Sequence, residues 1–451
     1  MAEIILASDI GSSSLKAAFI DFSGRLLALS RIPYTASQHC TAGHSIPDAR
    51  SWELAFAKAL EKLHAISPDS VPDCVCLSGN GPTLVPVTKD GEALPPLYWQ
   101  GSKIERASRS FFLPHAAWFK ENNPEEYERA EYFLSSHEWL AHALGADVFT
   151  ALPSAAYEPY YWDDDQFRLF GLDKMKFPAF IKMGGTAGQV SGKAASSFGA
   201  AAYLKGGTPI IAGGPDFISA IIGTGALKSG DVCDRAGSSE GINVCVEAPP
   251  SGMEGLRLLP HAKEGLWNIS ALIPSSGRLL EKYRRDSGQE SRTYDDLLTE
   301  LSYSLFPTPH SPFPIPNSSS LIPNSSFTKG QAVLCTMGFA VRRAIDTLGQ
   351  AGIAVKTMRV SGGQARNTRW NQLKADITGV TLLVPEIPDG ELAGNAVIAA
   401  SALKGESLEK AADRMIRIKD VYTPQNTEYW DEQFIKYLKG KIKPRRDTED
   451  Y

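Results

Sequence analysis

The sequence predicts an α/β protein, on three observations. Short runs of branched apolar residues alternate with longer segments that have the apolar spacing of helices, which is typical of mixed α/β folds. This alternation occurs twice, first over residues 4–145 and again from residue 209 onward. The 451 residues, 43% of them hydrophobic and 22% charged, have the composition of a globular protein and the length of two or three domains.

Three predicted strands open the chain. Residues 4–7, 15–20 and 26–32 are apolar and rich in branched side chains, and turn signals separate them at 9–14 and 21–24. Strands that follow one another through such short turns pair most simply with their neighbours in antiparallel order. We therefore expect an antiparallel meander at the start of the first α/β segment.

A helix is expected next. Apolar residues recur at helical spacing from Trp52 to Leu63, and Asp48 or Ser51 is the candidate N-cap. After this helix we expect strands at 75–78 and 84–87 and mostly helix over 103–145.

The second α/β segment has the same alternation. Its expected strands are 209–212, 358–360 and 382–384, and its expected helices are 217–222, 331–351, 367–378 and 392–403. Residues 305–326 interrupt it with a tract rich in Pro, Ser and Asn, whose composition cannot bury enough apolar surface to hold a fixed fold. We expect a flexible surface loop there.

Composition excludes several classes of protein. The chain has 46 Lys and Arg against 51 Asp and Glu, a formal net charge of −5, so we expect no nucleic-acid partner, which would need a dense basic surface. No apolar run approaches the roughly 20 residues of a membrane-spanning helix, and the N-terminus lacks the basic segment of a signal peptide. The six cysteines are scattered, which disfavours a cysteine-based metal site. We expect a cytoplasmic protein with no membrane partner.

The first segment suited to chemistry is Asp9-Ile10-Gly11-Ser12-Ser13-Ser14-Leu15-Lys16, at the end of the first predicted strand. Glycine lets backbone N–H groups approach an anion, and serines add hydroxyl donors. The Asp9 carboxylate could hold a hydrated Mg²⁺ beside phosphates. The segment is equally compatible with an ordinary hairpin turn, and it matches neither the Walker loop nor the dinucleotide-binding glycine pattern.

A second candidate is Asp216, which follows Gly213-Gly214-Pro215 at the carboxyl end of a predicted strand. Mixed α/β folds place their ligands at this edge of a sheet. The carboxylate could act as a general base, or it could simply be the N-cap of the helix that continues from Phe217. In isolation the N-cap role is the commoner one.

Two further glycine turns could contact a nucleotide. Gly237-Ser238-Ser239-Glu240-Gly241 is a small-residue turn suited to phosphate. Gly362-Gly363-Gln364-Ala365-Arg366-Asn367 lies between a strand and a helix, where its glycines could admit a base or ribose. Each pattern is a weak signal alone, because an ordinary turn that opens a helix is the simpler interpretation.

Together and in this order, the four segments resemble the motifs of the FGGY carbohydrate kinases, with a layout closest to xylulokinase-like members. The family's first phosphate motif, D-x-G-T/S-x-x-x-K, is matched by Asp9, Gly11, Ser12 and Lys16. The family's catalytic carboxylate, which follows a glycine pair, is matched by Asp216.

The remaining two motifs lie further along the chain. Gly237-Ser238-Ser239 begins 21 residues after the matched carboxylate and resembles the second phosphate motif. The stretch from Gly362 to Gln372, with Trp370 in place, is similar to the adenosine motif G-G-x-A-x-[SN]-x-x-W-x-Q.

The resemblance covers residues 4–404 and implies two ribonuclease-H-like domains of the actin-like ATPase type, which flank a nucleotide and sugar cleft. We expect an N-terminal domain over 1–220 and a C-terminal domain over 221–451. The implied activity is ATP- and Mg²⁺-dependent phosphorylation of a hydroxyl group on a sugar or polyol, with a pentulose such as xylulose favoured. A homodimer is left open.

The resemblance also implies roles for individual residues. Asp216 would be the general base, and Asp9 would hold Mg²⁺ through water. The nucleotide contacts would be Asp9, Gly11, Ser12, Ser13, Lys16, Gly237, Ser238, Ser239, Gly362, Gly363 and Asn367. The sugar contacts would be Asn80, Gly81, Trp99 and Gln100.

The sequence departs from the family at the expected sugar contacts. Asn80-Gly81-Pro82 stands where relatives often have M-H-G, and Trp99 to Lys103 lacks the carboxylate of the usual W-x-D-x-R. Phosphoryl transfer is therefore better supported than the identity of the acceptor. A catalytically weak or inactive member of the same fold, which senses a sugar or nucleotide, is the alternative.

Overall fold

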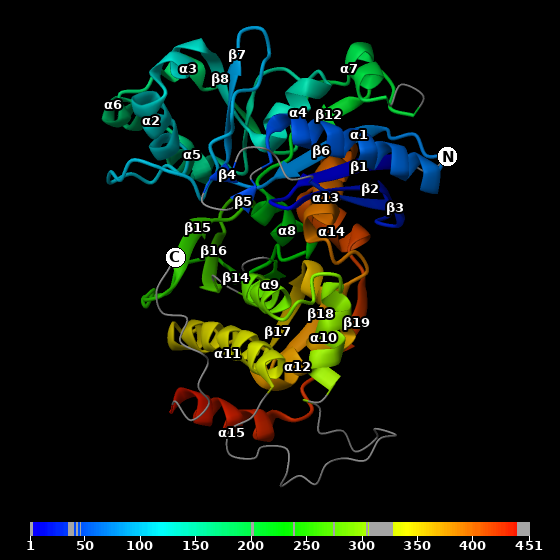
Figure 1. The fold of residues 1–451 in the computed structure, drawn as a ribbon, viewed down its shortest axis with the longest axis vertical. Helices are drawn as coiled ribbons and strands as arrows, with labels where there is room; N and C mark the ends of the chain where they lie inside the picture. The colour runs from blue at the N-terminus through cyan, green and yellow to red at the C-terminus, as the bar shows by residue number, and fades with distance from the viewer. Residues whose placement is uncertain are drawn as a thin grey trace. The chain divides into compact units, whose positions relative to one another are not determined.

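The structure is a computed structural model that describes residues 3–34, 40–41, 44–45, 47–199, 203–237, 240–273, 276–303, 305 and 328–439. Its chain forms two compact units, whose elements are labelled in Figure 1. Unit 1 comprises Met1–Leu227, Leu259–Leu266 and Asp389–Arg417, and unit 2 comprises Lys228–Leu258, Trp267–Pro388 and Ile418–Tyr451. Segment 389–417, which the sequence placed in the C-terminal domain, therefore packs with unit 1.

Unit 1 is built on a six-stranded sheet in the order β11-β12-β6-β1-β2-β3. The first three strands pair antiparallel, so the predicted meander is confirmed, whereas β6 runs parallel to β1 and β12 parallel to β6. As a result β1, β6 and β12 end at the same edge of the sheet. The strands are β1 (Ile4–Ile10), β2 (Ser14–Asp21), β3 (Leu26–Pro33), β6 (Cys74–Gly79), β11 (Thr186–Gln189) and β12 (Pro209–Ile211).

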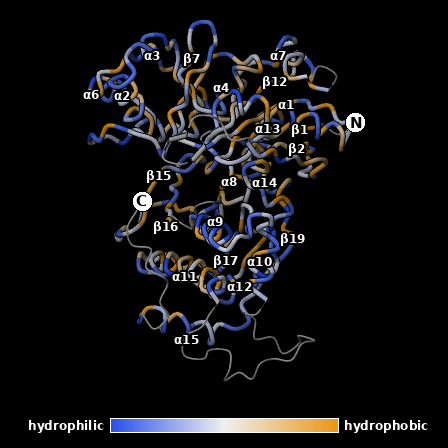
Figure 2. Tube along the Cα trace, viewed as in Figure 1, coloured by the Kyte–Doolittle hydropathy of each residue, from blue (hydrophilic) through white to orange (hydrophobic). Residues whose placement is uncertain are grey.

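Helices cover both faces of this sheet. On one face α1 (Ala49–Ile66) and α4 (Ser136–Leu144) bury Trp52 and Leu140 against apolar side chains of the strands. On the other face α13 (Gly390–Lys404) packs on β1 and β6, and α8 (Asp216–Gly223) packs on α13. Figure 2 shows the apolar character of β1 and α13. The Asp48 side chain accepts a hydrogen bond from the Ser51 N–H, which confirms Asp48 as the N-cap of α1.

The expectation of mostly helix over 103–145 is only partly correct. Residues 130–135 form a strand, β8, because they pair antiparallel with β7 and bury Phe133 and Leu134. The other elements of unit 1 are β4 (Cys40–Thr41), β5 (His44–Ser45), β7 (Leu84–Thr88), α2 (Leu113–Asn122), α3 (Pro124–Arg129), β8 (Ala130–Ser135), β9 (Thr150–Leu152), α5 (Glu158–Tyr161), α6 (Asp164–Phe170), β10 (Phe180–Lys182), α7 (Gly192–Ser197) and α14 (Leu408–Met415).

Unit 2 repeats the strand topology of unit 1. Its sheet has the order β15-β16-β14-β13-β17-β18-β19, in which β13, β14 and β16 pair antiparallel while β17 and β18 run parallel to β13. These five strands correspond in order and direction to β1, β2, β3, β6 and β12. The strands are β13 (Val232–Ala236), β14 (Glu240–Val246), β15 (Arg257–Pro260), β16 (Trp267–Ile273), β17 (Thr357–Ser361), β18 (Thr381–Pro385) and β19 (Ile418–Tyr422).

The helices of unit 2 pack around α11, which buries Val341 and Leu348 against the sheet and Phe339 against a second apolar cluster with Trp370 and Trp430. The helices predicted at 331–351 and 367–378 are confirmed. The loop predicted at 305–326 lies outside the described residues except for Leu305, which is buried. The helices are α9 (Ser276–Asp286), α10 (Tyr294–Tyr303), α11 (Lys329–Gln350), α12 (Thr368–Thr378) and α15 (Thr427–Leu438).

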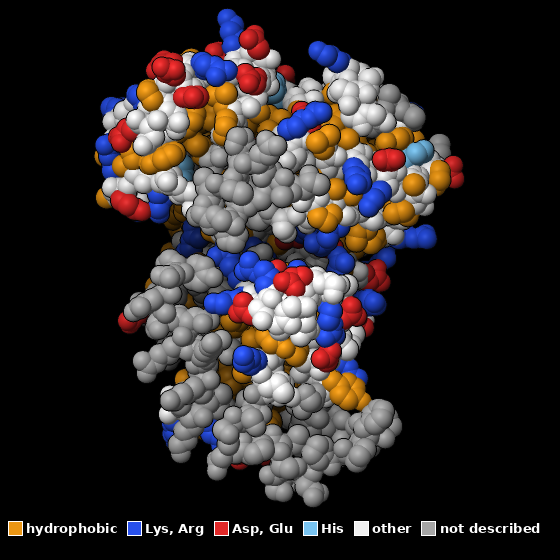
Figure 3. All heavy atoms as spheres, viewed as in Figure 1, with side chains coloured by type: hydrophobic (Ala, Val, Ile, Leu, Met, Phe, Trp, Pro, Cys, Tyr) orange, Lys and Arg blue, Asp and Glu red, His pale blue; other side chains and the backbone are white. Residues whose placement is uncertain are grey.

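The surface carries charged side chains of both signs. On the face drawn in Figure 3, Lys and Arg are interspersed with Asp and Glu over the described residues. Among the helices that the structure describes, none is both long enough and apolar enough to cross a membrane.

Candidate functional site

Three of the predicted site residues meet at the carboxyl edge of the unit 1 sheet. Asp9 is the penultimate residue of β1, and Asn80 directly follows β6. Gly79 forms a parallel bridge with Pro215, so Asp216 lies at the same edge. Adjacent parallel strands bring these residues together although they are distant in the sequence. Side chains gathered at this edge are where α/β sheets bind ligands.

Four polar side chains form a row across the strands of unit 1, each opposite the next in the pairing register. From β6 to β3 they are Ser78, Asp9, Lys16 and Arg31. Within the row, Ser78 Oγ donates a hydrogen bond of 2.9 Å to Asp9 Oδ1, and Lys16 Nζ lies 3.2 Å from Asp9 Oδ2. Both oxygens of the carboxylate are therefore engaged from its two neighbouring strands.

The start of α13 adds two carboxylates to this row. Glu391 Oε2 lies 3.0 Å from Lys16 Nζ, and Asp389 Oδ1 lies 3.7 Å from it. Asp389 also accepts from Arg31 at 2.9 Å. Burial, the largest single effect, lowers the pKa of Lys16, but Glu391, Asp9 and Asp389 together raise it well above its usual range. Lys16 is therefore a permanent cation held by three carboxylates.

Asp9 has an unusual protonation equilibrium. Only 1% of the residue is exposed, and this burial raises the pKa of its carboxyl to about 7 against the opposing effect of Lys16. The neighbouring carboxylates Glu391 and Asp216 raise the pKa further. Negative charge is thus concentrated at this point, and a divalent cation would relieve it.

The segment Gly11 to Ser13 is the turn between β1 and β2. The Gly11 N–H donates to the Ser14 carbonyl at 3.1 Å, so the backbone forms a hairpin turn. A hairpin turn was one of the two interpretations of this segment from the sequence. A Cβ on Gly11 would lie 2.9 Å from the same oxygen, which explains the glycine. Ser12 and Ser13 are exposed, so their hydroxyl groups are accessible to a ligand.

Asp216 is not an N-cap. Pro215 holds that position, with φ −57° and ψ 143°, and Asp216 is the first residue of α8. Its side chain is partly buried and interacts electrostatically with Asp9. The capping alternative is therefore wrong, because the rigid proline ends the preceding loop and begins the helix one residue earlier than expected.

The predicted sugar contacts differ in environment. Asn80 is 2% exposed, and its Oδ1 accepts a hydrogen bond of 2.8 Å from Thr83 Oγ1. Its Nδ2 is buried and has no hydrogen-bond partner among the described residues. Trp99 is 38% exposed and Gln100 is exposed, and in the described part of the chain no hydrogen bond or ring contact joins either of them to Asn80. Gly81 is partly exposed.

Unit 2 brings the two predicted nucleotide turns to one edge of its sheet. The parallel strands β13 and β17 end at Ala236 and Ser361, directly before Gly237 and Gly362. A Cβ on Gly362, whose φ is +98°, would lie 2.2 Å from the Ala236 carbonyl oxygen, so only glycine fits. Gly237 and Gly363 are exposed there. Ser238 and Ser239 lie outside the described residues.

Asn367 has a structural role in this geometry. It is the N-cap of α12, where its Oδ1 accepts from the Trp370 N–H at 2.8 Å. Its Nδ2 donates to Asp295 Oδ1 at 2.7 Å and to Thr299 Oγ1 at 2.8 Å. Its contribution to nucleotide binding stays a prediction, and these contacts show how it fixes the segment after Gly363.

Several residues of the unit 1 cluster were not among the predicted ones: Arg31, Ser78, Asp389, Glu391 and Asn395. The available signal was the acidic pair in Pro388-Asp389-Gly390-Glu391 at the start of a predicted helix, which alone indicates only favourable helix-terminal charges. Asn395 follows Glu391 by one helical turn and faces the same sheet. An asparagine among small apolar residues of a predicted helix was the available signal for it.

A buried ionic triad underlies the β13–β14 hairpin of unit 2. Lys374 Nζ of α12 lies 2.7 Å from Asp234 Oδ2 and 2.6 Å from Glu240 Oε1, and all three side chains are fully buried. Burial, and next the Glu240 carboxylate, raise the pKa of Asp234 to about 8. The triad lies close to the second predicted phosphate turn, because Glu240 pairs with Ala236 as the last pair of the hairpin before that turn.

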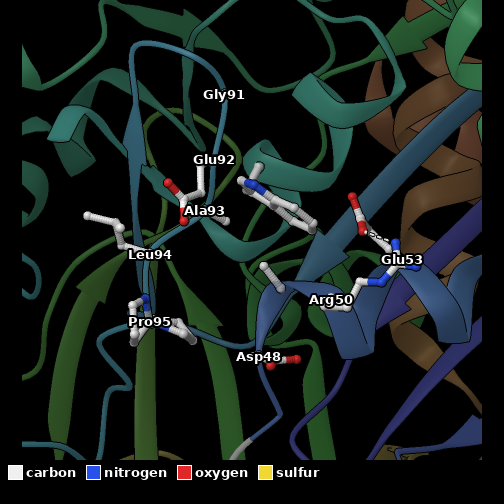
Figure 4. Close-up of a pocket in the computed structure, with 11 residues that line it drawn as sticks. Asp48, Arg50, Glu53, Gly91, Glu92, Ala93, Leu94 and Pro95 are labelled. Carbon is white, nitrogen blue, oxygen red and sulfur yellow. Dashed lines mark hydrogen bonds and ion pairs between the residues drawn. The ribbon is translucent and has the colours of Figure 1, made fainter. Parts of the chain in front are cut away.

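A pocket of about 560 Å³ opens elsewhere in unit 1, between the start of α1 and residues 91–96, with Trp139 in its wall. Figure 4 shows Arg50 and Glu53 joined across one side of it, at 2.9 Å. Glu92 is paired with Arg129. The charged groups that line this pocket already have partners, and none of the predicted site residues lines it. We therefore do not assign the reaction to this pocket.

Comparison with known proteins gives one consistent result. Residues 107–223 match the family model described as the FGGY family of carbohydrate kinases, N-terminal domain, and residues 306–403 match its C-terminal domain. The xylulose kinase of Bacillus subtilis (strain 168) is 23% identical over 482 residues, which cover 96% of this chain and 95% of that protein.

Solved structures agree in fold. A ligand-bound xylulose kinase and a gluconate kinase, both from Lactobacillus acidophilus, superpose with TM-scores of 0.74 and 0.76 at 16% identity. Each comparison covers 97% of both chains. The predicted fold class, two ribonuclease-H-like domains of the actin-like ATPase type, is thereby confirmed.

Proposed function

Because this chain belongs to the FGGY family of carbohydrate kinases and is a sugar kinase that uses ATP, we propose that it transfers the γ-phosphoryl group to a hydroxyl of a pentulose such as xylulose, with Asp216 as the general base. The observation that carries the proposal is the meeting of Asp9, Asn80 and Asp216 at one sheet edge. A phosphate anchor, a sugar contact and a base are all required there.

Asp216 would accept the proton of the attacking hydroxyl group. Its position at the start of α8, beside Asp9 at the carboxyl edge of the unit 1 sheet, supports this role. Asp9 lies close enough to Asp216 for the two carboxyl groups to interact electrostatically. General-base catalysis of this kind contributes about 10²- to 10⁴-fold to the rate.

Mg²⁺ fits the donors at this edge. Asp9 supplies hard carboxylate oxygens and would hold the ion through water, because Ser78 and Lys16 already engage both of these oxygens. Among the described residues no cluster of three or more His, Cys, Asp or Glu forms a complete metal cage. This agrees with Mg²⁺, which is commonly held by one or two carboxylates together with phosphates and water. Bound there, it would neutralise charge on the transferring phosphoryl group.

The remaining groups would position the reactants. In unit 1, Ser12 and Ser13 would donate to phosphate oxygens, and Lys16 would fix the Asp9 carboxylate. The buried Nδ2 of Asn80 would donate to a sugar hydroxyl, which would satisfy a donor that has no partner in the described structure. In unit 2, the exposed Gly237 and Gly363 would lie against the nucleotide. Positioning of this kind provides most of the catalysis of phosphoryl transfer.

The test is ADP release in a coupled assay over a panel of pentuloses, hexoses and polyols. Once the acceptor is found, Asp216→Asn and Asp216→Ala should each lower kcat by about 10²- to 10⁴-fold. Asp164→Asn is the matched control, because Asp164 is likewise the first residue of a helix in unit 1 but pairs with Lys174 on the surface. Near-normal turnover in both Asp216 variants would refute the proposed base.

The alternative is a sensing protein of the same fold without significant turnover. The missing carboxylate in Trp99 to Lys103 favours it. Its signature in the same panel would be binding of Mg·ATP, seen as a rise in the melting temperature, with no ADP formed from any sugar.

A further inference from the structure

A single buried asparagine connects four elements of unit 1. Asn395 of α13 is fully buried, and its Nδ2 donates to the Ser8 carbonyl of β1 at 2.8 Å and to Ser78 Oγ of β6 at 2.9 Å. Its Oδ1 accepts from Ser219 Oγ of α8 at 3.0 Å. The side chain thus uses both donors and its acceptor, each on a different element.

The orientation of this amide is determined by its partners. A carbonyl oxygen such as that of Ser8 can only accept, so the atom facing it must be Nδ2. With that assignment, the second N–H points at a lone pair of Ser78 Oγ, and the Asn395 oxygen faces the Ser219 hydroxyl.

The orientation of the Asn395 amide also determines that of the Ser78 hydroxyl group, which contacts Asp9. A serine hydroxyl has one proton, and because Ser78 Oγ already accepts from Asn395, that proton is directed to Asp9 Oδ1 at 2.9 Å. The three hydrogen bonds therefore run in one direction and end on the carboxylate. Such chains polarise one another when buried, and here Ser78, Asp9 and Asn395 are all at most 1% exposed.

The other end of the chain lies on the helix that carries the proposed base. Ser219 follows Asp216 by three residues on α8, so both lie on the same side of the helix. One amide therefore contacts, through one serine each, the helix of Asp216 and the carboxylate of Asp9.

We propose that Asn395 is a positioning residue for phosphoryl transfer. Through Ser78 it fixes the rotamer of the Asp9 carboxylate, and through Ser219 it holds α8 in register with that carboxylate. This inference rests on the proposed function, in which Asp9 supports the metal–phosphate group. Partners one shell beyond a metal-supporting carboxylate typically affect metal affinity or activity by about 10- to 100-fold.

The test compares Asn395→Ala, Ser78→Ala, their double variant and Ser219→Ala. We expect Asn395→Ala and Ser78→Ala each to lower kcat by about 10- to 100-fold, with KM for the sugar near the wild-type value. The double variant should be no worse than the more impaired of the two single variants, because both changes break the same chain to Asp9. Ser219→Ala should have the smallest effect, since the two donor bonds of Asn395 remain.

A second measurement does not depend on turnover. Mn²⁺ binding in the presence of ADP and without sugar, followed by the free-ion electron paramagnetic resonance signal, should weaken in Asn395→Ala and Ser78→Ala but not in Ser219→Ala. If Asn395→Ala does not fold, Ser78→Ala, which removes one oxygen atom, carries the test. Wild-type kcat and Mn²⁺ binding in Ser78→Ala, or effects that multiply in the double variant, would overturn the inference.

Asp9→Asn separates this inference from the proposed function. Normal turnover and Mn²⁺ binding in Asp9→Asn would refute the role proposed for Asp9 itself. Impaired Asp9→Asn together with normal Asn395→Ala and Ser78→Ala would refute only the positioning role of Asn395.

Discussion

Gly394 of α13 lies directly against the carbonyl oxygen of Ser219 of α8, so closely that a Cβ on Gly394 would be 1.8 Å from that oxygen. One turn away the relationship is reciprocal, because a Cβ on Gly223 of α8 would be 1.9 Å from the Gly390 carbonyl oxygen. The two helices therefore meet through their backbones, and this contact sets the distance between them.

Gly394→Ala should therefore separate the two helices. We expect a loss of about 1–3 kcal/mol in the free energy of unfolding, measured by urea denaturation, because backbone atoms cannot yield as a flexible side chain can. Gly349→Ala is the control: it is also a helical glycine, but a Cβ there meets nothing within 4 Å. That variant should be neutral or slightly stabilising. Equal stability of the two variants would contradict the close contact.

The buried triad of unit 2 should respond very differently to two substitutions. Lys374→Met leaves Asp234 and Glu240 buried without a cation, and we expect it to cost about 3–5 kcal/mol. Asp234→Asn should cost less than about 1 kcal/mol, because the raised pKa of Asp234, about 8, means that its carboxyl is already mainly protonated at pH 7. Urea denaturation at pH 7 measures the free energy of unfolding of both variants. A loss in Asp234→Asn as large as that in Lys374→Met would show that both carboxylates are ionised.

Stability should fall in mild acid partly because of His137. The residue is 3% exposed, neither ring nitrogen has a hydrogen-bond partner among the described residues, and burial lowers the pKa of its imidazole to about 3. The unfolded chain takes up a proton near pH 6.5 whereas the folded chain does not, so this contribution is complete above pH 6.5 and is lost as the pH falls toward 3.

His137→Leu removes this dependence. Between pH 6.5 and pH 5 the unfolding free energy of the wild type should fall by about 1.5 kcal/mol more than that of the variant. Urea denaturation at the two pH values measures the difference. Parallel losses in both proteins would mean that the imidazole is protonated in the folded state.

Local patterns predicted local structure well, and distant contacts account for what was missed. The meander of β1 to β3 and the cap at Asp48 follow from turn signals and apolar spacing, which act over a few residues. The pairing of Lys16 with Glu391 joins residues 375 positions apart, and no local pattern contains it. The boundary of α8 was missed for a different reason. The helix begins one residue earlier than expected, so Pro215 and not Asp216 is the N-cap.

The structure brings three of the predicted residues together, in a charge environment that the sequence did not predict. Motif order proposed Asp9 and Asp216, and the strand pairing of β1 with β6 and of Gly79 with Pro215 brings them to one edge with Asn80. The sequence suggested Lys16 as a positive charge for phosphate, yet in the folded chain three carboxylates surround it. The charge around Lys16 depends on the start of α13, which supplies Asp389 and Glu391. The packing of that helix on the sheet is a property of the tertiary structure.

Two substitutions at this cation should shift ATP affinity in opposite directions. Lys16→Met leaves Asp9, Asp389 and Glu391 without their ammonium group, so repulsion of the triphosphate grows and KM for ATP should rise by about 3- to 10-fold. Glu391→Gln keeps the shape but removes one negative charge, so KM for ATP should fall by a similar or smaller factor. Lys404→Met is the control, because Lys404 also belongs to unit 1 but pairs with Glu3 on the surface. Steady-state kinetics and calorimetric binding of Mg·ADP measure the effect, and shifts of the same sign in Lys16→Met and Glu391→Gln would show that local charge does not control nucleotide affinity.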